Sequence, residues 1–401
     1  YPGYEWPEGR PAKTVPGYDR LTKVGAVWGA VYGWEVPLWF APEGEEREDV
    51  WNYRTFNSMP HIGTECRAVR EAVGLFEMTP MAKFEVLGPR AEAWLNSILA
   101  NRMPRHIGSM VLAHLLTHKG TVRAEFTVTR LADNLFYLVG TPRGEQHDFD
   151  VLEKALPTDG GVRLRNATLE RGCLTVVGPR ARDVLQDLVD ADLSNNAFPW
   201  MTAQTVTVGL ASDVRIMRIN YEGELGWELY HPIPYNLHLL SEITQAGVAH
   251  ELKYCGYRAI ESLRLEKSYR AMYRDLDIEH TAIESGLNRF VKFDKSDFVG
   301  KNALLKQQDQ GLTRCMVTLK VETIDADAYM NEAVYQGSKL VGRVTSGATS
   351  HNVGNCLSMA YVEIEQASPG TELEVQVLEN RCRAVVIEDS PYDPQSKRPR
   401  S

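Results

Sequence analysis

The 401-residue sequence lacks the features that mark several large classes of protein. No apolar stretch approaches the roughly 20 residues that a membrane-spanning helix needs, and no signal peptide opens the chain. No G-x-G-x-x-G dinucleotide-binding motif occurs. The net charge is −9, without long runs of either sign. These absences argue against a membrane protein, a dinucleotide-binding domain and a protein whose main partner is nucleic acid.

Cysteine is scarce, and no two cysteines form a C-x-x-C pair. The sequence therefore predicts neither a zinc site nor a disulfide framework, and we expect no metal. Free thiols indicate a reducing compartment, so the expected location is cytoplasmic, or the mitochondrial matrix if the source is eukaryotic. The six cysteines are Cys66, Cys173, Cys255, Cys315, Cys356 and Cys382.

The first 60 residues read as an irregular connector. Prolines at positions 2, 7, 11 and 16 prevent a continuous helix. Glycines recur at 25, 29 and 33, a spacing that can mark close helix packing. The segment 34–42 is rich in Trp and Pro, which predicts a docking arm, with an ordinary surface arm as the alternative. Because the sequence starts at Tyr1 and not at Met, we expect a fragment, a processed product or a subunit cut from something longer.

Gly-Pro-Arg-Ala occurs twice, at 88–91 and 178–181. Each copy follows an apolar strand-like run and precedes a helical pattern, predicted at 92–99 and 182–189. The repeat predicts a duplicated βα unit with a cleft where the two copies meet. The alternative is that Gly-Pro-Arg is simply a common helix start.

The stretch from Tyr221 to Tyr230 predicts a hairpin. Glu222-Gly-Glu224 reads as a tight turn after an apolar strand over 214–220. On the returning strand Leu225, Trp227 and Leu229 share one face, and Gly226, Glu228 and Tyr230 share the other. A carboxylate beside an aromatic ring suits a flat ring with adjacent N–H donors. The alternative is a hairpin whose Glu228 points to water.

A second acid, Glu125, lies on the polar face of a predicted strand, with Tyr137 expected across from it on the paired strand 134–139. The alternative is a solvent-facing glutamate. Helices are predicted at 236–246 and 257–270, and on the second Arg264 can pair with Glu261 at helical spacing. From residue 314 onward short strands separated by turn residues predict a small barrel or sandwich.

Several of these segments resemble one family. Residues 221–230, 32–42, 262–266, 283–301 and 342–350 resemble the glycine-cleavage aminomethyltransferase (T-protein) fold, especially the version fused behind the flavin domain of dimethylglycine and sarcosine dehydrogenases. The resemblance covers roughly residues 15–390. It implies an α+β, three-lobed folate-binding fold with duplicated βα subdomains and a C-terminal small β-barrel. The implied domains are a connector from a flavin-type domain (1–60), the folate-binding domain (61–310), the barrel (311–392) and a loose tail (393–401).

The resemblance also assigns residues. Tetrahydrofolate is the implied cofactor, with Glu228 on the N–H edge of its pterin, Tyr221 packed on or near that ring, and Arg264 on its glutamate tail. Glu125 falls where the family has its catalytic Asp, and Tyr137 keeps the spacing of a folate-contacting Tyr. The two acids are expected to close on one pterin. Glutamate in place of aspartate moves the carboxylate about one bond further out, and a shift of ~1 Å can cost ~100-fold in rate.

The implied activity is capture of an iminium or formaldehyde unit, released by N-demethylation of a methylated amine, to form 5,10-methylenetetrahydrofolate. FAD is then expected only in an upstream or separate amine-oxidising domain that is absent from these residues, and the methylated amine concerns this chain only indirectly. Two alternatives remain open. One is a stand-alone aminomethyltransferase working with a lipoyl carrier protein, and the other is a folate-fold module without chemistry.

Overall fold

A computed structural model describes residues 6–50, 52–323 and 325–401. The chain divides into two compact units that interleave along the sequence. Unit 1 contains Tyr1–Lys83, Asn166–Arg264 and Gln395–Ser401, and unit 2 contains Phe84–Arg165 and Leu265–Pro394. Each unit is therefore assembled from segments far apart in sequence.

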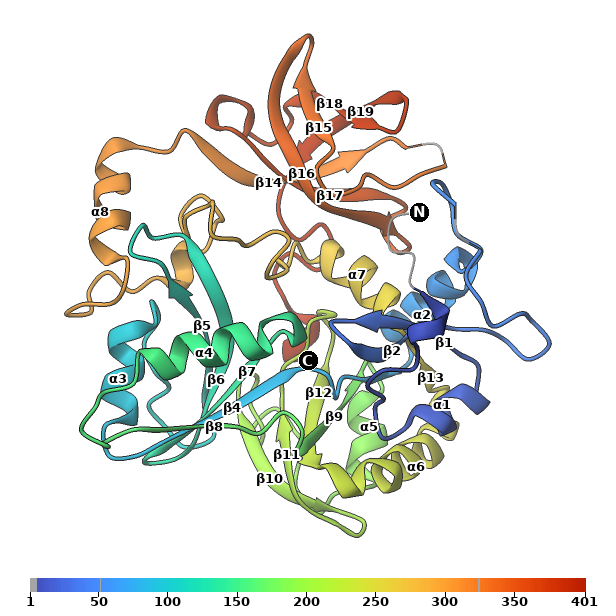
Figure 1. Ribbon diagram of the computed structural model, residues 1–401. Helices are drawn as coiled ribbons and strands as arrows, with labels where there is room; N and C mark the ends of the chain where they lie inside the picture. Colours follow the sequence, from blue (N-terminus) through green and yellow to red (C-terminus); the bar gives the residue numbers. More distant parts are fainter. Residues whose placement is uncertain (1–5, 51, 324) are drawn as a thin grey trace. The chain divides into compact units, whose positions relative to one another are not determined.

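Unit 1 is built on a six-stranded sheet in the order β10-β11-β12-β9-β3-β13. Its strands β9 to β12 are the green and yellow-green strands labelled in Figure 1. Apolar side chains of one face, including Leu174 and Trp227, pack with helices α5 and α6 in a single core. The strands are β3 (Gly74–Glu77), β9 (Arg171–Val177), β10 (Ala203–Val208), β11 (Ala211–Met217), β12 (Gly226–Pro232) and β13 (Lys253–Tyr254). The helices are η1 (Pro7–Gly9), α1 (Tyr18–Lys23), α2 (Met59–Glu71), α5 (Ala181–Gln186), η3 (Ile233–Tyr235), α6 (Asn236–Gly247), η4 (Val248–His250), α7 (Tyr257–Glu266, which ends in unit 2) and η7 (Arg398–Arg400).

The N-terminal glycine repeat lies in a β-hairpin, so the expected helix packing is wrong. Strands β1 (Ala26–Val31) and β2 (Trp34–Phe40) pair directly across Tyr32 and Gly33, whose φ values of 52° and 85° fit a two-residue type I′ turn. Trp34 and Trp39 are 3% and 1% exposed and pack in cores of unit 1 itself. The aromatic residues predicted to dock elsewhere are thus covered by their own unit. Residues 1–5 and 51 of the predicted connector lie outside the described residues.

Unit 2 contains a five-stranded sheet in the order β5-β6-β7-β4-β8. Its strands are β4 (Ala82–Leu87), β5 (Met110–Leu116), β6 (Val122–Ala132), β7 (Leu135–Gly140) and β8 (Arg163–Asn166). Its helices are α3 (Ala91–Ile98), η2 (Pro142–Gly144), α4 (Glu145–Lys154), η5 (Asn288–Phe290) and α8 (Lys301–Gln310). On β6 the buried Ala124, Phe126 and Val128 alternate with partly exposed residues, as the sequence pattern predicts.

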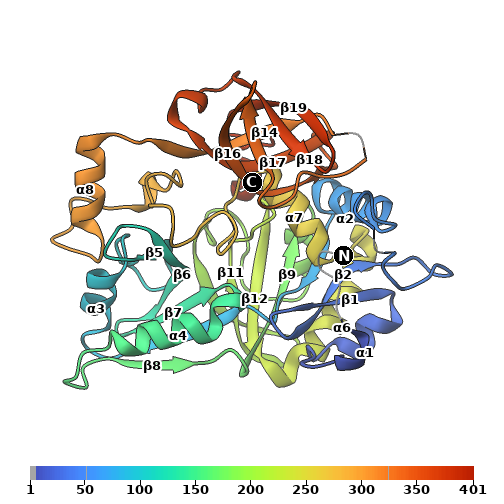
Figure 2. The ribbon, with the colours of Figure 1, turned by 45° about the horizontal axis from the view of Figure 1, so that its top comes forward.

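The C-terminal strands of unit 2 close into a barrel, shown in orange and red in Figure 2. Its order is β14-β17-β16-β15-β18-β19, so both edges of the sheet are paired and the barrel alternative is confirmed. The strands are β14 (Arg314–Val321), β15 (Ala333–Gln336), β16 (Lys339–Ser350), β17 (Asn355–Glu363), β18 (Glu372–Val377) and β19 (Asn380–Ile387), with η6 (Ile364–Gln366) between them. Buried Val, Leu and Ala side chains fill its interior.

The duplicated Gly-Pro-Arg-Ala segments have the same local structure. Gly88 and Gly178 have φ values of 129° and 137°, which residues other than glycine rarely adopt. A Cβ at either glycine would lie 2.3 or 2.5 Å from a backbone oxygen, of Gly161 and Ala72 respectively. Each glycine is followed by a helix, then by three strands that return beside the strand before the glycine. The duplication is therefore a whole strand–helix–meander unit and not merely a helix start.

The fifth strand of each sheet comes from the other copy. Strand β3, which opens the first copy, pairs with β9 of the second, and β8, which opens the second, pairs with β4 of the first. The chain thus crosses between the sheets twice.

Three predicted boundaries differ from the structure. Helix α5 ends at Gln186 and not at 189. Helix α7 ends at Glu266 and not at 270. Strand β11 ends at Met217, so residues 218–225 form a longer connection than the predicted tight turn.

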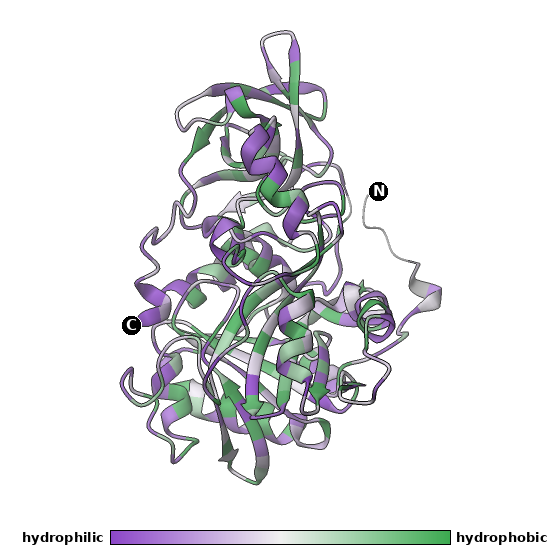
Figure 3. Cartoon of the chain, turned by 90° about the vertical axis from the view of Figure 1, so that its left-hand side faces the viewer, coloured by the Kyte–Doolittle hydropathy of each residue, from purple (hydrophilic) through white to green (hydrophobic). Residues whose placement is uncertain are grey.

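Within the described residues, no helix is long and apolar enough to cross a membrane. Figure 3 shows hydrophilic residues beside hydrophobic ones along the helices.

Candidate functional site

Glu228 stands in the middle of the unit 1 sheet, on the face opposite Trp227 and Leu229, as the alternation predicts. Its neighbours across the strands are Met217 on β11 and Thr175 on β9. A strand flanked on both sides holds its side chains in fixed directions. The carboxylate is therefore carried on a rigid support.

The electrostatic setting of Glu228 is unusual. Burial raises the pKa of Glu228 to about 8, and the nearby Glu222 adds to the rise. The Tyr230 hydroxyl, two residues along the same strand, donates to Oε2 at 2.7 Å and opposes the rise. Among the described residues Oε1 has no hydrogen-bond partner. Glu228 thus keeps an open acceptor position, and Tyr230 is a contact that the sequence interpretation left unassigned.

Tyr221 belongs to the connection 218–225, which is held by its own side chains. Asn220 accepts hydrogen bonds from the backbone N–H groups of Glu222 and Gly223 and donates to the carbonyl of Glu224. Tyr221 itself is partly buried and packs against a core cluster of unit 1. These bonds bridge the segment internally, although it is longer than a hairpin turn.

Arg70 on α2 connects this segment to the helix that carries Arg264. Its guanidinium donates to the Glu222 carbonyl at 2.8 Å, to Glu224 at 3.3 Å and to the Leu263 carbonyl at 3.3 Å. Arg70 and Glu224 are almost fully buried. The sequence offered no signal for this role, because Arg70 lies 152 to 193 residues from its partners.

Arg264 is fully buried and donates twice to Oε2 of Glu261, at 2.9 and 3.3 Å. The predicted pairing of these two side chains is confirmed. The Glu261 side chain is one-third exposed, so only the glutamate of this ion pair is accessible to solvent. Whether Arg264 binds a folate tail stays a prediction.

In unit 2 Glu125 lies on β6 directly opposite His114 of β5. Its Oε2 is 2.8 Å from Nε2 of His114, while its side chain is 21% exposed. His114 was not singled out in the sequence interpretation, since its register could not be known before the strands were paired.

The expected pairing of Glu125 with Tyr137 is wrong. Tyr137 on β7 lies opposite Thr129, four residues further along β6. The reason is that β6 runs on to Ala132 and the turn to β7 falls at residues 133 and 134, which shifts the register of the two strands. Tyr137 is buried, and its predicted folate contact is untested.

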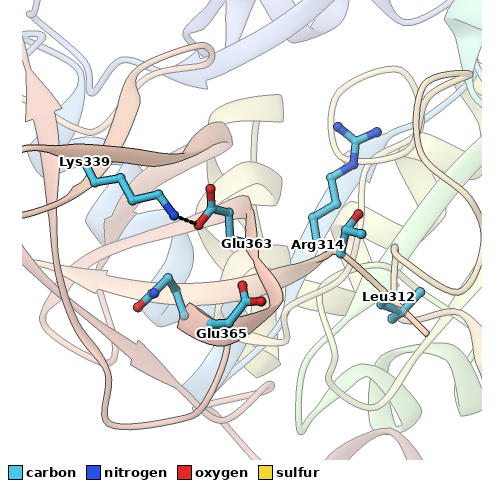
Figure 4. A pocket seen from close by; sticks show the side chains of 7 residues that line it. Leu312, Arg314, Lys339, Glu363 and Glu365 are labelled. Carbon is cyan, nitrogen blue, oxygen red and sulfur yellow. Dashed lines mark hydrogen bonds and ion pairs between the residues drawn. The ribbon is translucent and has the colours of Figure 1, made fainter. Parts of the chain in front are cut away.

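Two other features hold charged groups but none of the predicted residues. A pocket of about 620 Å³ in unit 2 is lined by Arg314, Lys339, Glu363 and Glu365 among others, and Figure 4 shows Lys339 paired with Glu363. A separate cluster of Asp277, Glu279 and His280 has the atoms to hold a metal ion. His280 already pairs with Asp277, and its ring stacks on the ring of Tyr361 with the centroids 3.5 Å apart. It therefore also has a packing role.

The comparisons with known proteins agree with this fold. The GCVT N-terminal domain family matches residues 17–295, and the glycine cleavage T-protein C-terminal barrel domain matches residues 314–393. The chain therefore belongs to the glycine cleavage T-protein family and has the folate-binding aminomethyltransferase fold. The predicted α+β fold class with its terminal barrel is confirmed.

Individual relatives differ in what they do. Mouse dimethylglycine dehydrogenase is 35% identical over 97% of this chain and 45% of that protein. The mouse pyruvate dehydrogenase phosphatase regulatory subunit is 30% identical over 92% of this chain and 43% of that protein. The crystal structure of aminomethyltransferase T from Bartonella henselae is 26% identical with a TM-score of 0.82, over 96% of this chain and 99% of that one. The chain thus spans less than half of the length of these two mouse relatives.

Proposed function

We propose that the chain is a tetrahydrofolate-dependent one-carbon acceptor, which captures an iminium or formaldehyde unit from a demethylated amine and forms 5,10-methylenetetrahydrofolate. The observation that carries the proposal is the partly buried carboxylate of Glu228, with Tyr230 on one oxygen and no hydrogen-bond partner for the other among the described residues. An ionised carboxylate in such a place suits two adjacent N–H donors of a pterin.

The proposed roles follow the family assignment residue by residue. Glu228 accepts the pterin N–H groups, Tyr221 packs on or near the ring, and Arg264 pairs with the glutamate tail. In unit 2 Tyr137 contacts the folate and Glu125 is the catalytic carboxylate. The domain limits at 60, 310 and 392 are proposed on the same basis.

The proposed reaction requires no oxidation or reduction by this chain. The reaction joins one carbon to N5 and N10 of the folate and loses water when that carbon arrives as formaldehyde, or the amine when it arrives as an iminium. The negative charge of Glu125 stabilises the cationic iminium, and its free oxygen accepts the proton that N10 loses as the ring closes. Enclosure keeps the reactive carbon from escaping to water.

The oxidation that produces the one-carbon unit belongs to another domain or subunit in this proposal. Dimethylglycine dehydrogenase has more than half of its length outside the matched region, which leaves room for an FAD-bearing amine-oxidising domain there. By the same relative, a mitochondrial matrix location is proposed for a eukaryotic source, and a cytoplasmic one otherwise.

Calorimetry with tetrahydrofolate under anaerobic conditions tests the proposal. The wild-type chain is expected to bind, and Glu228→Ala is expected to lose binding while remaining folded. Glu71→Ala is the matched control, since Glu71 is an exposed acid on α2 of the same unit. Absence of binding by the wild type contradicts the proposal, as does undiminished binding by Glu228→Ala.

Two other functions are each favoured by one observation. The Bartonella henselae structure is matched over nearly its whole length, which favours a stand-alone aminomethyltransferase. Glycine-cleavage activity with a lipoylated carrier protein would establish that function. The regulatory-subunit relative favours a module without chemistry. An intact fold that binds no tetrahydrofolate would support it.

A further inference from the structure

The His114–Glu125 pair is a built feature of the unit 2 sheet. The two residues are direct partners in the β5–β6 ladder, so their side chains rise from the same face at adjacent positions. His114 is completely buried although it lies on the polar face, and its ring packs against Phe290 with the centroids 5.6 Å apart. Glu125 stands at the edge of this buried site and remains partly exposed.

The hydrogen-bond pattern favours one tautomer of His114. Nε2 lies 2.8 Å from the carboxylate, whereas Nδ1 is buried without a partner. A hydrogen on Nδ1 would leave a buried donor unpaired, which is costly. The arrangement with the fewest unpaired donors is a neutral ring whose Nε2–H is donated to Oε2 of Glu125.

This bond restrains a side chain that is otherwise flexible. A glutamate has three rotatable side-chain bonds, and a partly exposed one on a strand samples many rotamers. A donor on a buried, packed ring holds Oε2 and so limits the carboxylate to one orientation. Oε1 has no hydrogen-bond partner among the described residues, and it is the oxygen left for chemistry.

We propose that His114 is the positioning residue of Glu125, which orients its carboxylate for one-carbon transfer and makes glutamate serve where the family has the shorter aspartate. This inference rests on the proposed function. It predicts an effect on rate and not on folate affinity, because His114 acts through Glu125.

The experiment compares variants of the full chain by two readouts, tetrahydrofolate binding and the acceleration of formaldehyde capture over the uncatalysed condensation. His114→Leu is expected to bind within about threefold of wild type while its maximal rate falls at least ~10-fold, since an ångström of misplacement can cost ~100-fold. His114→Gln, which restores a donor, is expected to recover most of the rate. Leu112→Ala is the control, because Leu112 lies on the same face of β5 opposite Thr127 and its apolar side chain donates no hydrogen bond to Glu125.

A double-mutant test separates positioning from general damage. In the Glu125→Gln background, His114→Leu is expected to have no further effect on rate. An additive loss, or an unchanged rate in His114→Leu alone, overturns the inference while leaving the proposed function standing. Wild-type chain that neither binds tetrahydrofolate nor accelerates capture overturns both.

The wild type supplies a check that does not depend on any variant folding. Nitrogen-15 NMR of the ten labelled histidines is expected to include a signal from His114 protonated at Nε2 with a bare Nδ1, assigned by its loss in His114→Gln. This signal is expected to change in Glu125→Gln and to be absent in His114→Gln. A hydrogen located on Nδ1 of His114 refutes the positioning role.

Discussion

Raising the pH is expected to tighten tetrahydrofolate binding through Glu228. Burial raises the pKa of Glu228 to about 8, so near pH 7 the free protein carries this group mainly as the neutral acid. The proposed contact with two N–H donors needs the ionised form, and binding therefore releases a proton. Affinity is expected to rise as the pH increases through 8 and then to level off.

The magnitude follows from the ionised fraction. One pH unit below its pKa a carboxyl group is ionised in about one molecule in ten, and one unit above in about nine in ten. An apparent dissociation constant scales inversely with the fraction in the competent state. Between pH 9 and pH 7 the affinity is thus expected to weaken about tenfold, which corresponds to ~1.4 kcal/mol.

Titration calorimetry at pH 6, 7, 8 and 9 in two buffers of different ionisation enthalpy measures both the dissociation constant and the number of protons released on binding. Below pH 8 the observed heat is expected to depend on the buffer, because close to one proton is released per folate bound. Glu228→Gln is expected to bind weakly at every pH and to release no proton.

Glu222 supplies the control for this effect. Burial also raises the pKa of Glu222, to about 7, and its charge raises that of Glu228. Glu222→Gln is therefore expected to keep the pH dependence but to shift its midpoint downward. A dissociation constant that is flat from pH 6 to 9, with no proton release, would refute the reasoning.

Three further predictions concern stability, each read from urea unfolding with circular dichroism. The pKa of Glu228 is raised in the folded state, so the contribution of this group to the free energy of unfolding is fully present below about pH 4.5 and is lost as the pH rises to about 8. Glu228→Gln is therefore expected to lose less stability than wild type between pH 5 and 9. Arg70→Met breaks a buried ion pair and two bonds to carbonyls and is expected to cost ~3–5 kcal/mol, against less than ~0.5 for the exposed Arg67→Met on the same helix. Gly178→Ala places a Cβ 2.5 Å from a backbone oxygen and is expected to cost ~1–3 kcal/mol, whereas Gly9→Ala, with nothing within 4 Å, is expected to be nearly neutral. Equal losses in either matched pair would contradict the structural assignment.

The strands that carry the candidate residues were predictable because their signals are local. Alternation on β6 and β12 places Glu125 and Glu228 on polar faces, and the repeated Gly-Pro-Arg-Ala segments mark the duplicated units. Both signals come from side chains a few positions apart, which the sequence shows directly.

Register and burial were harder to predict because they depend on distant partners. The length of β6 decides that Tyr137 faces Thr129, and only the paired β5 reveals His114 beside Glu125. The glycines of the N-terminal segment fit helix packing by spacing alone, yet positive φ at Tyr32 and Gly33 makes a hairpin. Arg70 joins segments that lie 152 to 193 residues from it, a relation that no local pattern carries.

The exchange of β3 and β8 between the two sheets has a consequence for how the chain is made. Neither copy of the repeat contains all the strands of its own sheet, because the opening strand of each copy pairs in the sheet of the other. During synthesis β3 must wait unpaired until β9 emerges almost a hundred residues later. A polypeptide cut between the copies would leave both pieces with an open sheet edge, and such edges invite association with other chains. We therefore expect the two copies to fold only together.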